Sequence, residues 1–262
     1  MRSRPRNKNT EQPVRPLHER ELLRICGLAA VQALFDRDPG RVERLFFEPA
    51  LRSALDANCQ VLARSHKPYR QVDSAELTRV AGTVLHGGAV AIARPRPLVD
   101  FDPDAVRGWA QDGKPLLFLD GIGNPHNLGA IARSAAFFGL ARIVLADRPD
   151  QALPSDAAYR VAEGGLEHLM LYRARLPSVL CAVRRAYRIV GTSLAGDSTG
   201  LNPTGDRPVA LILGNEKTGL DAAMLALCDD VVRIPSSGHV QSLNVASAAA
   251  ILIYLLTRSP SG

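Results

Sequence analysis

Apolar residues recur along the first third of the chain at spacings that predict a small α/β unit. Between Leu17 and Phe35 they fall three residues apart, which predicts a helix. The positions are Leu22, Ile25, Leu28, Val31 and Leu34. Arg41–Glu48 and Ala89–Ala93 are short apolar runs that predict strands, with helical and turn-like segments between them. Together these elements predict a unit over residues 17–94.

A polar stretch follows this unit, "RPRPLVDFDPD" from Arg94 to Asp104, and it contains three prolines. Proline fixes its own backbone and disfavours a helical conformation in the residue before it. We therefore predict a linker over residues 95–113.

From residue 114 onward, apolar runs alternate strictly with helical patterns. The predicted strands are Leu116–Asp120, Arg142–Ala146, His168–Tyr172, Ile189–Ser193, Val209–Leu213 and Val231–Ile234. The predicted helices are Ala130–Phe138, Ser155–Glu163, Pro177–Ala186, Leu220–Leu227 and Leu243–Leu256. This rhythm predicts a parallel sheet covered by helices, and such sheets bind ligands beyond the carboxyl ends of their strands. One irregular segment, Ala195–Pro208, exceeds the usual loop length and favours a functional or mobile role.

The charge of the chain favours a polyanionic partner. Its 262 residues carry a net charge of +6, and the pI of the sequence is about 9.4. Residues 1–16 are strongly basic, with five Lys or Arg against one Glu. Because this segment has few apolar side chains to bury, we predict a disordered basic tail. It would either follow a phosphate backbone or serve to keep the protein in solution, and the sequence leaves both roles open.

The spacing of cysteine and histidine predicts neither a disulfide framework nor a metal site. The four cysteines form no Cys-x-x-Cys pair, and the six histidines include no His-Glu-x-x-His motif. No hydrophobic leader follows the N-terminus, and the longest apolar run, Val245–Leu256, is too short to span a bilayer. We therefore expect a cytoplasmic protein with reduced thiols, no metal and no membrane insertion.

Three strand-to-helix loops carry the polar residues best suited to chemistry. They are "DGIGNPHNLGAIARS" (Asp120–Ser134), "LILGNEKTGL" (Leu211–Leu220) and "RIPSSGHVQSLNVASAAA" (Arg233–Ala250), and are called loops 1, 2 and 3 below. Because the carboxyl ends of parallel strands lie at one edge of a sheet, we expect the three loops to meet there.

A dinucleotide-binding loop is the first alternative to test. Gly121 and Gly123 follow a predicted strand as the Gly-x-Gly-x-x-Gly motif requires, but His126 occupies the third glycine position. Loop 2 lacks the Gly-Lys-Ser/Thr end of a phosphate-binding loop. The sequence therefore disfavours a Rossmann-type oxidoreductase.

The same three loops, in this order, resemble the three signature motifs of the SpoU (TrmH-like) RNA ribose 2′-O-methyltransferases of the SPOUT superfamily. The first motif matches at Asn124, Asn127, Gly129, Arg133 and Phe138-Gly139. The second is Gly214-Asn215-Glu216-Lys217-Thr218-Gly219-Leu220, and the third is Ile234-Pro235-Ser236-Ser237-Gly238 continued by Ser242-Leu243-Asn244-Val245. The match covers about Lys114 to Arg258, and Ser236 departs from it where the family often has a bulky apolar residue. Residues 17–94 resemble, less closely, the small L30e-like substrate-binding domain that often precedes this catalytic domain.

The resemblance implies a SPOUT α/β-knot fold, with a parallel sheet flanked by helices and a deep C-terminal trefoil knot. It places an L30e-like RNA-binding domain over residues 17–94 and the catalytic domain over residues 114–262. It implies S-adenosylmethionine as methyl donor, ribosomal or transfer RNA as acceptor, and a homodimer through the catalytic domain. The cofactor contacts it implies are Thr192, Ser193, Leu194, Gly214, Asn215, Ile234, Ser242 and Leu243.

The resemblance also makes Arg133 the catalytic arginine. Asn124, Glu216, Ser242 and Asn244 would orient Arg133, the ribose hydroxyl and the cofactor, while Asn127 and Arg133 would contact RNA. A guanidinium is effectively always protonated, so we favour Arg133 as a clamp on the adjacent phosphate, with the role of a base left open.

Each of these residues also has a purely structural interpretation. Asn124 and Asn127 could form a turn and cap a helix, Ser242 could cap the last helix, and Glu216 could complement a helix dipole. Arg133 could pair with a surface carboxylate. A catalytically silent RNA-binding relative would have the same fold, and the intact polar set argues against it.

Overall fold

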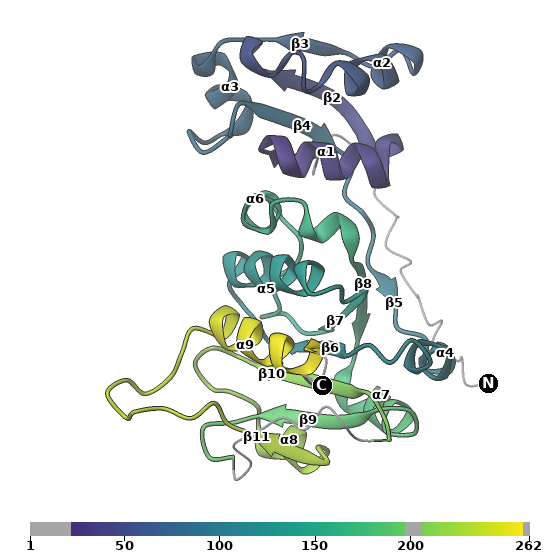
Figure 1. Cartoon of the computed structure of the whole chain (residues 1–262), viewed down its shortest axis with the longest axis vertical. Helices are drawn as coiled ribbons and strands as arrows, with labels where there is room; N and C mark the ends of the chain where they lie inside the picture. The colour runs from purple at the N-terminus through teal and green to yellow at the C-terminus, as the bar shows by residue number, and fades with distance from the viewer. Residues whose placement is uncertain (1–21, 197–205, 259–262) are drawn as a thin grey trace, which may run out of the picture.

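The computed structural model describes residues 22–196 and 206–258, which form two sheets, one above the other in Figure 1. The predicted basic tail over residues 1–16 lies outside the described residues, as does the middle of the long segment 195–208.

The small unit at the top of Figure 1 is a four-stranded sheet with the strand order β1-β4-β2-β3. Its elements are β1 (Leu23–Cys26), α1 (Leu28–Arg37), β2 (Val42–Phe47), α2 (Asp56–Arg64), β3 (Tyr69–Gln71), α3 (Ser74–Ala81) and β4 (Ala89–Ala93). The predicted strands Arg41–Glu48 and Ala89–Ala93 are confirmed as β2 and β4.

The predicted helix over residues 17–35 is wrong in its described first half. Leu23–Cys26 is strand β1, paired antiparallel with β4, and the helix starts only at Leu28. Leu23 and Ile25 are both buried, which fits the two-residue period of a strand, whereas Leu22 of the predicted helical spacing is exposed. Gly27 separates the two elements with φ of 97°, a left-handed conformation that ends regular structure.

The large unit is a seven-stranded sheet in which all pairings are parallel, as predicted. Its order is β11-β9-β10-β6-β7-β8-β5. The strands are β5 (Val99–Asp100), β6 (Leu116–Asp120), β7 (Arg142–Ala146), β8 (Met170–Ala174), β9 (Arg188–Thr192), β10 (Val209–Gly214) and β11 (Asp230–Val232).

Helices cover both faces of this sheet because its central strands are apolar on both sides. Leu117 and Leu119 of β6 pack in one buried cluster, and Leu116 and Phe118 pack in the other. The first face carries α5 (Pro125–Phe137), α6 (Asp156–Ala162) and α9 (Val245–Thr257), and the second carries α4 (Val106–Ala110), α7 (Leu176–Val183) and α8 (Ala222–Ala226).

The predicted linker contains regular structure. Residues 95–113 include β5, which pairs with β8 at the edge of the large sheet, and the short helix α4. Its prolines therefore precede a strand and a helical turn. The domain boundaries themselves stay a prediction.

Helix α5 begins five residues earlier than predicted, at Pro125 instead of Ala130. The Asn124 side chain accepts a hydrogen bond from the backbone N–H of His126, and Pro125 occupies the first helical position, where its missing N–H costs nothing. Much of the polar stretch interpreted as a loop is thus the first turn of a helix.

The two units contact each other through α1 and β1 above, and α6 and the short 3-10 helix Gly165–His168 below (Figure 1). None of the helices in the described ranges is long and apolar enough to cross a membrane. The deep trefoil knot stays a prediction.

Candidate active site

Loops 1 and 2 leave neighbouring strands at the same level. β6 and β10 are paired in register up to Asp120 beside Gly214. Loop 3 follows β11 farther along the sheet, and helix α9 at its end packs against α5 at the end of loop 1. The expectation that the three loops meet at one edge is confirmed, because side chains from all three are hydrogen-bonded to one another.

Three of the predicted residues form this connection, which we call the polar relay: Glu216 of loop 2, Asn127 of α5 and Asn244 of loop 3. The Asn127 Nδ2 donates to the Glu216 Oε1 at 2.8 Å. The Asn244 Nδ2 donates to the Asn127 Oδ1 at 3.1 Å. Asn127 is only 9% exposed, so both ends of its amide serve the relay and its expected RNA contact stays a prediction.

The relay is continuous with the starts of two helices. The backbone N–H groups of Gly123 and Asn124 donate to the Glu216 carboxylate at 3.3 and 3.4 Å. The Asn244 Oδ1 accepts from the N–H of Ala246 at 2.8 Å and caps α9. Asn244, and not the alternative Ser242, is therefore the cap of the last helix, while Asn124 caps α5 as its structural interpretation predicts.

Hydrogen bonding sets the charge of Glu216. Burial by itself would raise the pKa of this carboxyl, but the hydrogen bonds from Asn127 and from the backbone N–H groups of Glu216, Gly123 and Asn124 together outweigh it. The pKa of Glu216 therefore lies below its ordinary value. The relay holds a carboxylate, not a carboxylic acid, at neutral pH.

Other contacts fix the loops around the relay. The Asn215 Nδ2 donates to the backbone oxygen of Gly121 at 2.7 Å, which joins loop 2 to loop 1. Gly214 has no space for a side chain, because a Cβ there would lie 2.5 Å from the backbone nitrogen of Leu220. Buried Gln151 accepts from the N–H groups of Gly121 and Ile122 at 3.0 and 3.2 Å. Sequence reasoning missed Gln151, because one Gln in a polar loop carries no spacing signal.

Arg133 lies apart from the relay. It is two helical turns beyond Asn124 on α5, and its guanidinium pairs with Glu163 at 2.8 Å. Both side chains are 55% exposed, so this is the surface pair that the structural interpretation of Arg133 predicts. Within one chain, the structure brings Asn124, Glu216 and Asn244 together and leaves Arg133 at the surface, paired with Glu163. Its catalytic role stays a prediction.

The remaining predicted cofactor residues flank the same edge. The Thr192 Oγ1 donates to the backbone oxygen of Ile212 at 3.1 Å, and the Ser193 N–H donates to the backbone oxygen of Val232 at 3.1 Å. Ile234 packs partly buried against the core, and Ser242 is exposed.

These residues fit S-adenosylmethionine. Leu194 and Leu243 are 55% and 46% exposed, so apolar surface that a ligand could cover lies beside strand ends rich in backbone donors and acceptors. Small-molecule sites commonly combine such apolar walls with a few backbone polar groups.

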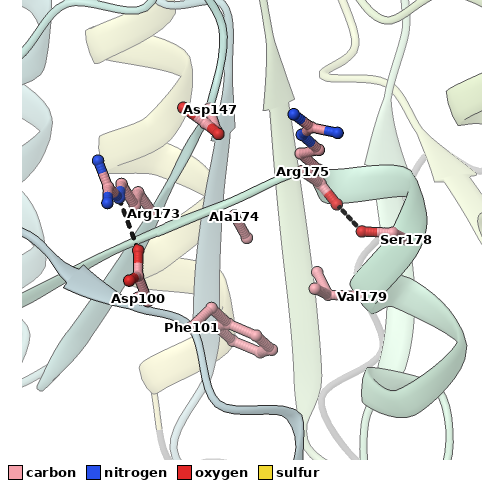
Figure 2. A pocket seen from close by; sticks show the side chains of 8 residues that line it. All are labelled: Asp100, Phe101, Asp147, Arg173, Ala174, Arg175, Ser178 and Val179. Atoms are coloured by element: carbon pink, nitrogen blue, oxygen red, sulfur yellow. Dashed lines mark hydrogen bonds and ion pairs between the residues drawn. The ribbon is translucent and has the colours of Figure 1, made fainter. Parts of the chain in front are cut away.

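A hollow of about 330 Å³ opens farther along the edge, at the carboxyl ends of β7 and β8 (Figure 2). The chain leaves β7 towards α6 on one face and leaves β8 towards α7 on the other, and crevices form where connections diverge in this way. The hollow is lined by Asp100, Phe101, Asp147, Arg173, Ala174, Arg175, Ser178 and Val179.

This hollow is not strongly basic. Arg173 donates to Asp100 at 2.6 Å, and that hydrogen bond holds the pKa of Asp100 below its ordinary value. Asp147 faces the same space as Arg175. A smaller hollow of about 210 Å³ shares Asp147 and Arg175 and extends to Asp120. Neither hollow has a predicted site residue among its described lining residues. No group of three or more His, Cys, Asp or Glu side chains suited to a metal is found in the described ranges.

Comparison with known proteins identifies the family. The sequence model of the SpoU rRNA methylase family matches residues 114–254, more than half of the chain, and includes all three loops. The chain therefore belongs to the SpoU rRNA methylase family. A second model, described as RNA 2′-O ribose methyltransferase substrate binding, matches residues 24–99.

Similar proteins agree with this membership. The chain is 32% identical to the 23S rRNA (guanosine-2′-O-)-methyltransferase RlmB of Acinetobacter baylyi, over 90% of this chain and 97% of the relative. It is 34% identical to an uncharacterized tRNA/rRNA methyltransferase, YfiF, of Escherichia coli O157:H7, over 89% of this chain and 67% of the relative. A crystal structure of an RNA 2′-O ribose methyltransferase matches with a TM-score of 0.67 at 27% identity, over 89% of this chain and 86% of that one.

Membership of the SpoU family confirms the predicted fold family, with its small α/β unit before the parallel sheet. It also confirms the predicted enzyme class, an RNA 2′-O-methyltransferase, and its cofactor, because SpoU methylases use S-adenosylmethionine. An S-adenosylmethionine-bound rRNA methyltransferase of Sinorhizobium meliloti has the same fold, with a TM-score of 0.73 at 22% identity, over 89% of this chain and 86% of that one.

Proposed function

We propose that this SpoU methylase modifies a ribose 2′-hydroxyl of ribosomal RNA, with transfer RNA as the alternative substrate. The polar relay carries the proposal, because it joins all three family motifs at one sheet edge and leaves Ser242 and Asn124 exposed beside it. The similarity to the 23S rRNA methyltransferase over both units favours the ribosomal substrate. The four cysteines of the chain are free, which suits action in the cytoplasm.

S-adenosylmethionine supplies an electrophilic methyl group on a sulfonium. We propose that Leu194, Ile234 and Leu243 cover its adenine, while backbone groups around Thr192, Ser193, Gly214 and Asn215 hydrogen-bond to it. Ser242, exposed two residues before the α9 cap, would orient the ribose hydroxyl. Asn127 would hold Glu216 and Asn244 in place on the side of the site that faces RNA.

Glu216 is poorly suited to remove the hydroxyl proton. Its carboxylate already accepts hydrogen bonds from Gly123, Asn124 and Asn127, and its pKa lies below the ordinary value. A general base works best with a pKa near the working pH. We infer that Glu216 fixes the shape of loops 1 and 2, and that Arg133 binds the phosphate next to the target ribose.

A homodimer would bring Arg133 into a site. Phe137 lies one helical turn beyond Arg133 on α5 and is 81% exposed, and Tyr254 of α9 is 51% exposed. Phe138 joins them, with ring centroids 5.1 Å from Phe137 and 5.9 Å from Tyr254. This aromatic face is the surface that we propose a second copy covers. Arg133 would then lie at the boundary between two subunits, near the partner's relay.

Methylation mapping tests the function. Purified protein with S-adenosylmethionine should add 2′-O-methyl groups to deproteinised 23S rRNA at one or a few positions, detected by resistance of the adjacent phosphodiester to alkali. Arg133→Ala should lower kcat by about 10²- to 10³-fold, the usual cost of removing one charge-stabilising donor, and leave S-adenosylhomocysteine binding unchanged. The matched control Glu163→Gln breaks the same ion pair without removing the guanidinium and should retain activity.

Full activity of Arg133→Ala would refute the assignment of this residue. Tight RNA binding without methyl transfer by the wild-type protein would indicate a catalytically silent RNA-binding protein instead. Methylation of transfer RNA alone would make transfer RNA the substrate in place of ribosomal RNA. Sedimentation of Phe137→Lys tests the dimer. The variant should sediment as a monomer and lose activity, and a wild-type protein that is monomeric at micromolar concentration would contradict the pairing.

A further inference from the structure

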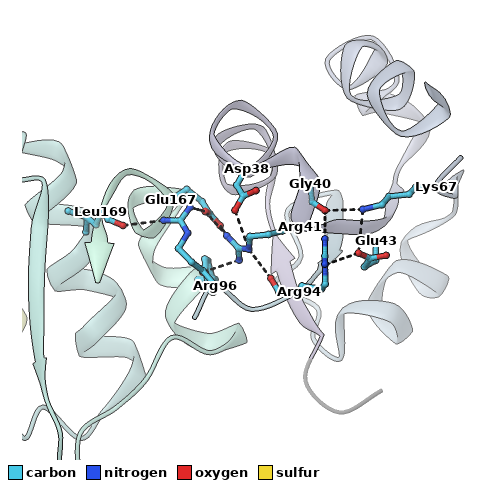
Figure 3. A network of polar contacts seen from close by, with 10 residues as sticks. Asp38, Gly40, Arg41, Glu43, Lys67, Arg94, Arg96, Glu167 and Leu169 are labelled. Carbon is cyan, nitrogen blue, oxygen red and sulfur yellow. Dashed lines mark hydrogen bonds and ion pairs between the residues drawn. The ribbon is translucent and has the colours of Figure 1, made fainter. Parts of the chain in front are cut away.

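A buried charge cluster lies between the two units, outside the three motifs. We call it the Glu167 cluster, and Figure 3 shows Arg41 and Arg96 around Glu167. The hydroxyl of Tyr159 completes it. Arg41 precedes β2 in the small unit, and Arg96 belongs to the segment that joins the units. Glu167 and Tyr159 belong to the large unit, in the 3-10 helix and in α6.

Both oxygens of Glu167 are engaged. The Arg41 Nη1 donates to Oε1 at 3.1 Å and to Oε2 at 2.9 Å, and the Arg96 Nη2 donates to Oε2 at 2.7 Å. The Glu167 side chain is 0% exposed and that of Arg41 is 7% exposed. Arg41 also donates to the Tyr159 hydroxyl at 3.3 Å and to the backbone oxygen of Arg94 at 2.8 Å.

The backbones around the cluster approach closely. A Cβ at Gly164 would lie 2.9 Å from the Ala33 Cβ of α1, so only glycine allows this approach. The Arg24 N–H of β1 donates to the Asp156 Oδ1 of α6 at 2.9 Å, and the two side chains form an ion pair at 3.2 Å. Charged and hydrogen-bonded contacts of this kind fix direction, whereas apolar contacts by themselves tolerate sliding.

Arg41 and Glu167 are both buried, so taking either one away leaves the other with fewer charge partners inside the protein, which is costly. Separation of the small unit from the large one would take Arg41 away from Glu167 and break this pair. The units therefore have one strongly preferred orientation among the described residues. Substrate RNA held by the small unit then meets the polar relay at a fixed distance and angle.

We propose that Glu167 is a positioning residue: it holds the substrate-binding unit in one orientation to the methyl-transfer edge, so that the fixed span between them selects which ribose is modified. The inference rests on the proposed RNA methylation. It concerns the choice of site and the use of a folded RNA, and it assigns Glu167 no contact with RNA or cofactor.

Glu167→Gln tests the proposal, because it keeps the size of the side chain and removes its charge. On deproteinised 23S rRNA, kcat/KM at the main site should fall by about 100-fold, the order expected when a reacting group is misplaced, with the loss mainly in KM. Extra methylated positions should appear.

On a short single-stranded ribo-oligonucleotide, kcat should stay within about twofold of wild type, since a misplaced substrate loses rate only where placement depends on the small unit. The control Asp100→Asn breaks the exposed ion pair with Arg173 and should leave all of these values unchanged.

A cross-link separates positioning from loss of folding. Arg24→Cys with Asp156→Cys, placed in the Glu167→Gln protein, would join the same two units by a disulfide at a point where β1 and α6 are already in contact. Oxidation should restore site choice and kcat/KM on the rRNA, and reduction should abolish the rescue.

Three results would overturn the proposal. They are unchanged site choice in Glu167→Gln, a failure of the oxidised protein to recover, and an equal loss on the oligonucleotide and in S-adenosylhomocysteine binding. A wild-type protein that methylates no RNA would instead refute the proposed function, and the two failures are therefore distinguishable.

Discussion

Glu216 and Glu167 are both carboxylates held by several donors, yet the protein uses them in opposite surroundings. Glu216 is exposed at the sheet edge and accepts from an amide and two loop N–H groups of neighbouring residues, all uncharged. Glu167 is fully buried and accepts from two guanidinium groups. Neutral donors leave a net negative charge next to solvent, whereas the two arginines more than cancel it. The open surroundings of Glu216 suit a site that must admit a ligand. The buried surroundings of Glu167 suit a contact between two units that must exclude water.

Glu216 and Glu167 should therefore differ in what their loss affects, activity or stability. Interactions at a solvent-exposed edge contribute little free energy of folding, because water competes for each donor and acceptor. A buried ion cluster contributes little when compared with apolar packing, but costs much when broken. Damage at Glu216 should therefore appear in methyl transfer, and damage at Glu167 in unfolding and in substrate placement.

The largest expected effect is on the stability of the Glu167→Ala protein. Removal of this carboxylate leaves the buried Arg41 with only the more distant Asp38, at 4.0 Å, as a charge partner. Breaking a buried pair in this way typically costs about 3–5 kcal/mol of unfolding free energy. Urea denaturation followed by circular dichroism would measure it. Asp100→Ala, at an exposed ion pair, should leave the unfolding free energy nearly unchanged. Equal losses in the two variants would show that burial of Glu167 has no special weight.

The next effect is on the activity of the Glu216→Gln protein. The amide can keep one contact with Asn127 but loses the charge that gathers the N–H groups of Gly123 and Asn124, so loop 1 should shift. We expect kcat to fall by about 10- to 100-fold, with about 1 kcal/mol or less lost in unfolding free energy. Single-turnover methyl transfer and urea denaturation on the same preparation measure both quantities. A large loss of stability with normal kcat would reverse the roles assigned to the two carboxylates.

The smallest effect is on the pH dependence of stability. The folded pKa of Glu216 lies below its ordinary value of 4.5, so its ionised form is favoured by folding. Its contribution is fully present above pH 4.5 and is lost as the pH falls through the lower, folded pKa. The difference in thermal midpoint between wild type and Glu216→Gln should therefore shrink as the pH is lowered below 4.5. A difference that grows on acidification would contradict the sign of this shift.

Periodicity predicted the parallel sheet well because its central strands are buried on both faces and read as unbroken apolar runs. Leu116–Asp120 and Arg142–Ala146 match the observed strands β6 and β7 at both ends. It failed at residues 22–28, where Leu22, Ile25 and Leu28 fit a helical spacing by coincidence and the pairing of β1 with β4 decides the structure. Pairing with a strand more than sixty residues away leaves no mark on local spacing.

The candidate site shows the same division. Asn124, Glu216 and Asn244 could be named from the motifs, and the sheet order brings them together. Gln151 could not be named from the sequence, because it acts by accepting hydrogen bonds from N–H groups of loop 1, which is 30 residues earlier in the chain. Arg133 was named from its motif, but its pairing with Glu163 depends on the packing of α5 against α6, which the motif does not contain.

By itself, the sequence determined the residue types at three strand ends, the apolar strands that bring those ends to one edge, and the family to which they belong. The tertiary structure decided which of those residues touch, that Arg133 faces outward, and that the expected linker joins the large sheet and supplies Arg96 to a buried carboxylate. The physical reason is range. Hydrophobic spacing and caps act over a few neighbouring residues, whereas the pairing of Glu167 with Arg41 joins positions 126 residues apart and exists only once both units have folded.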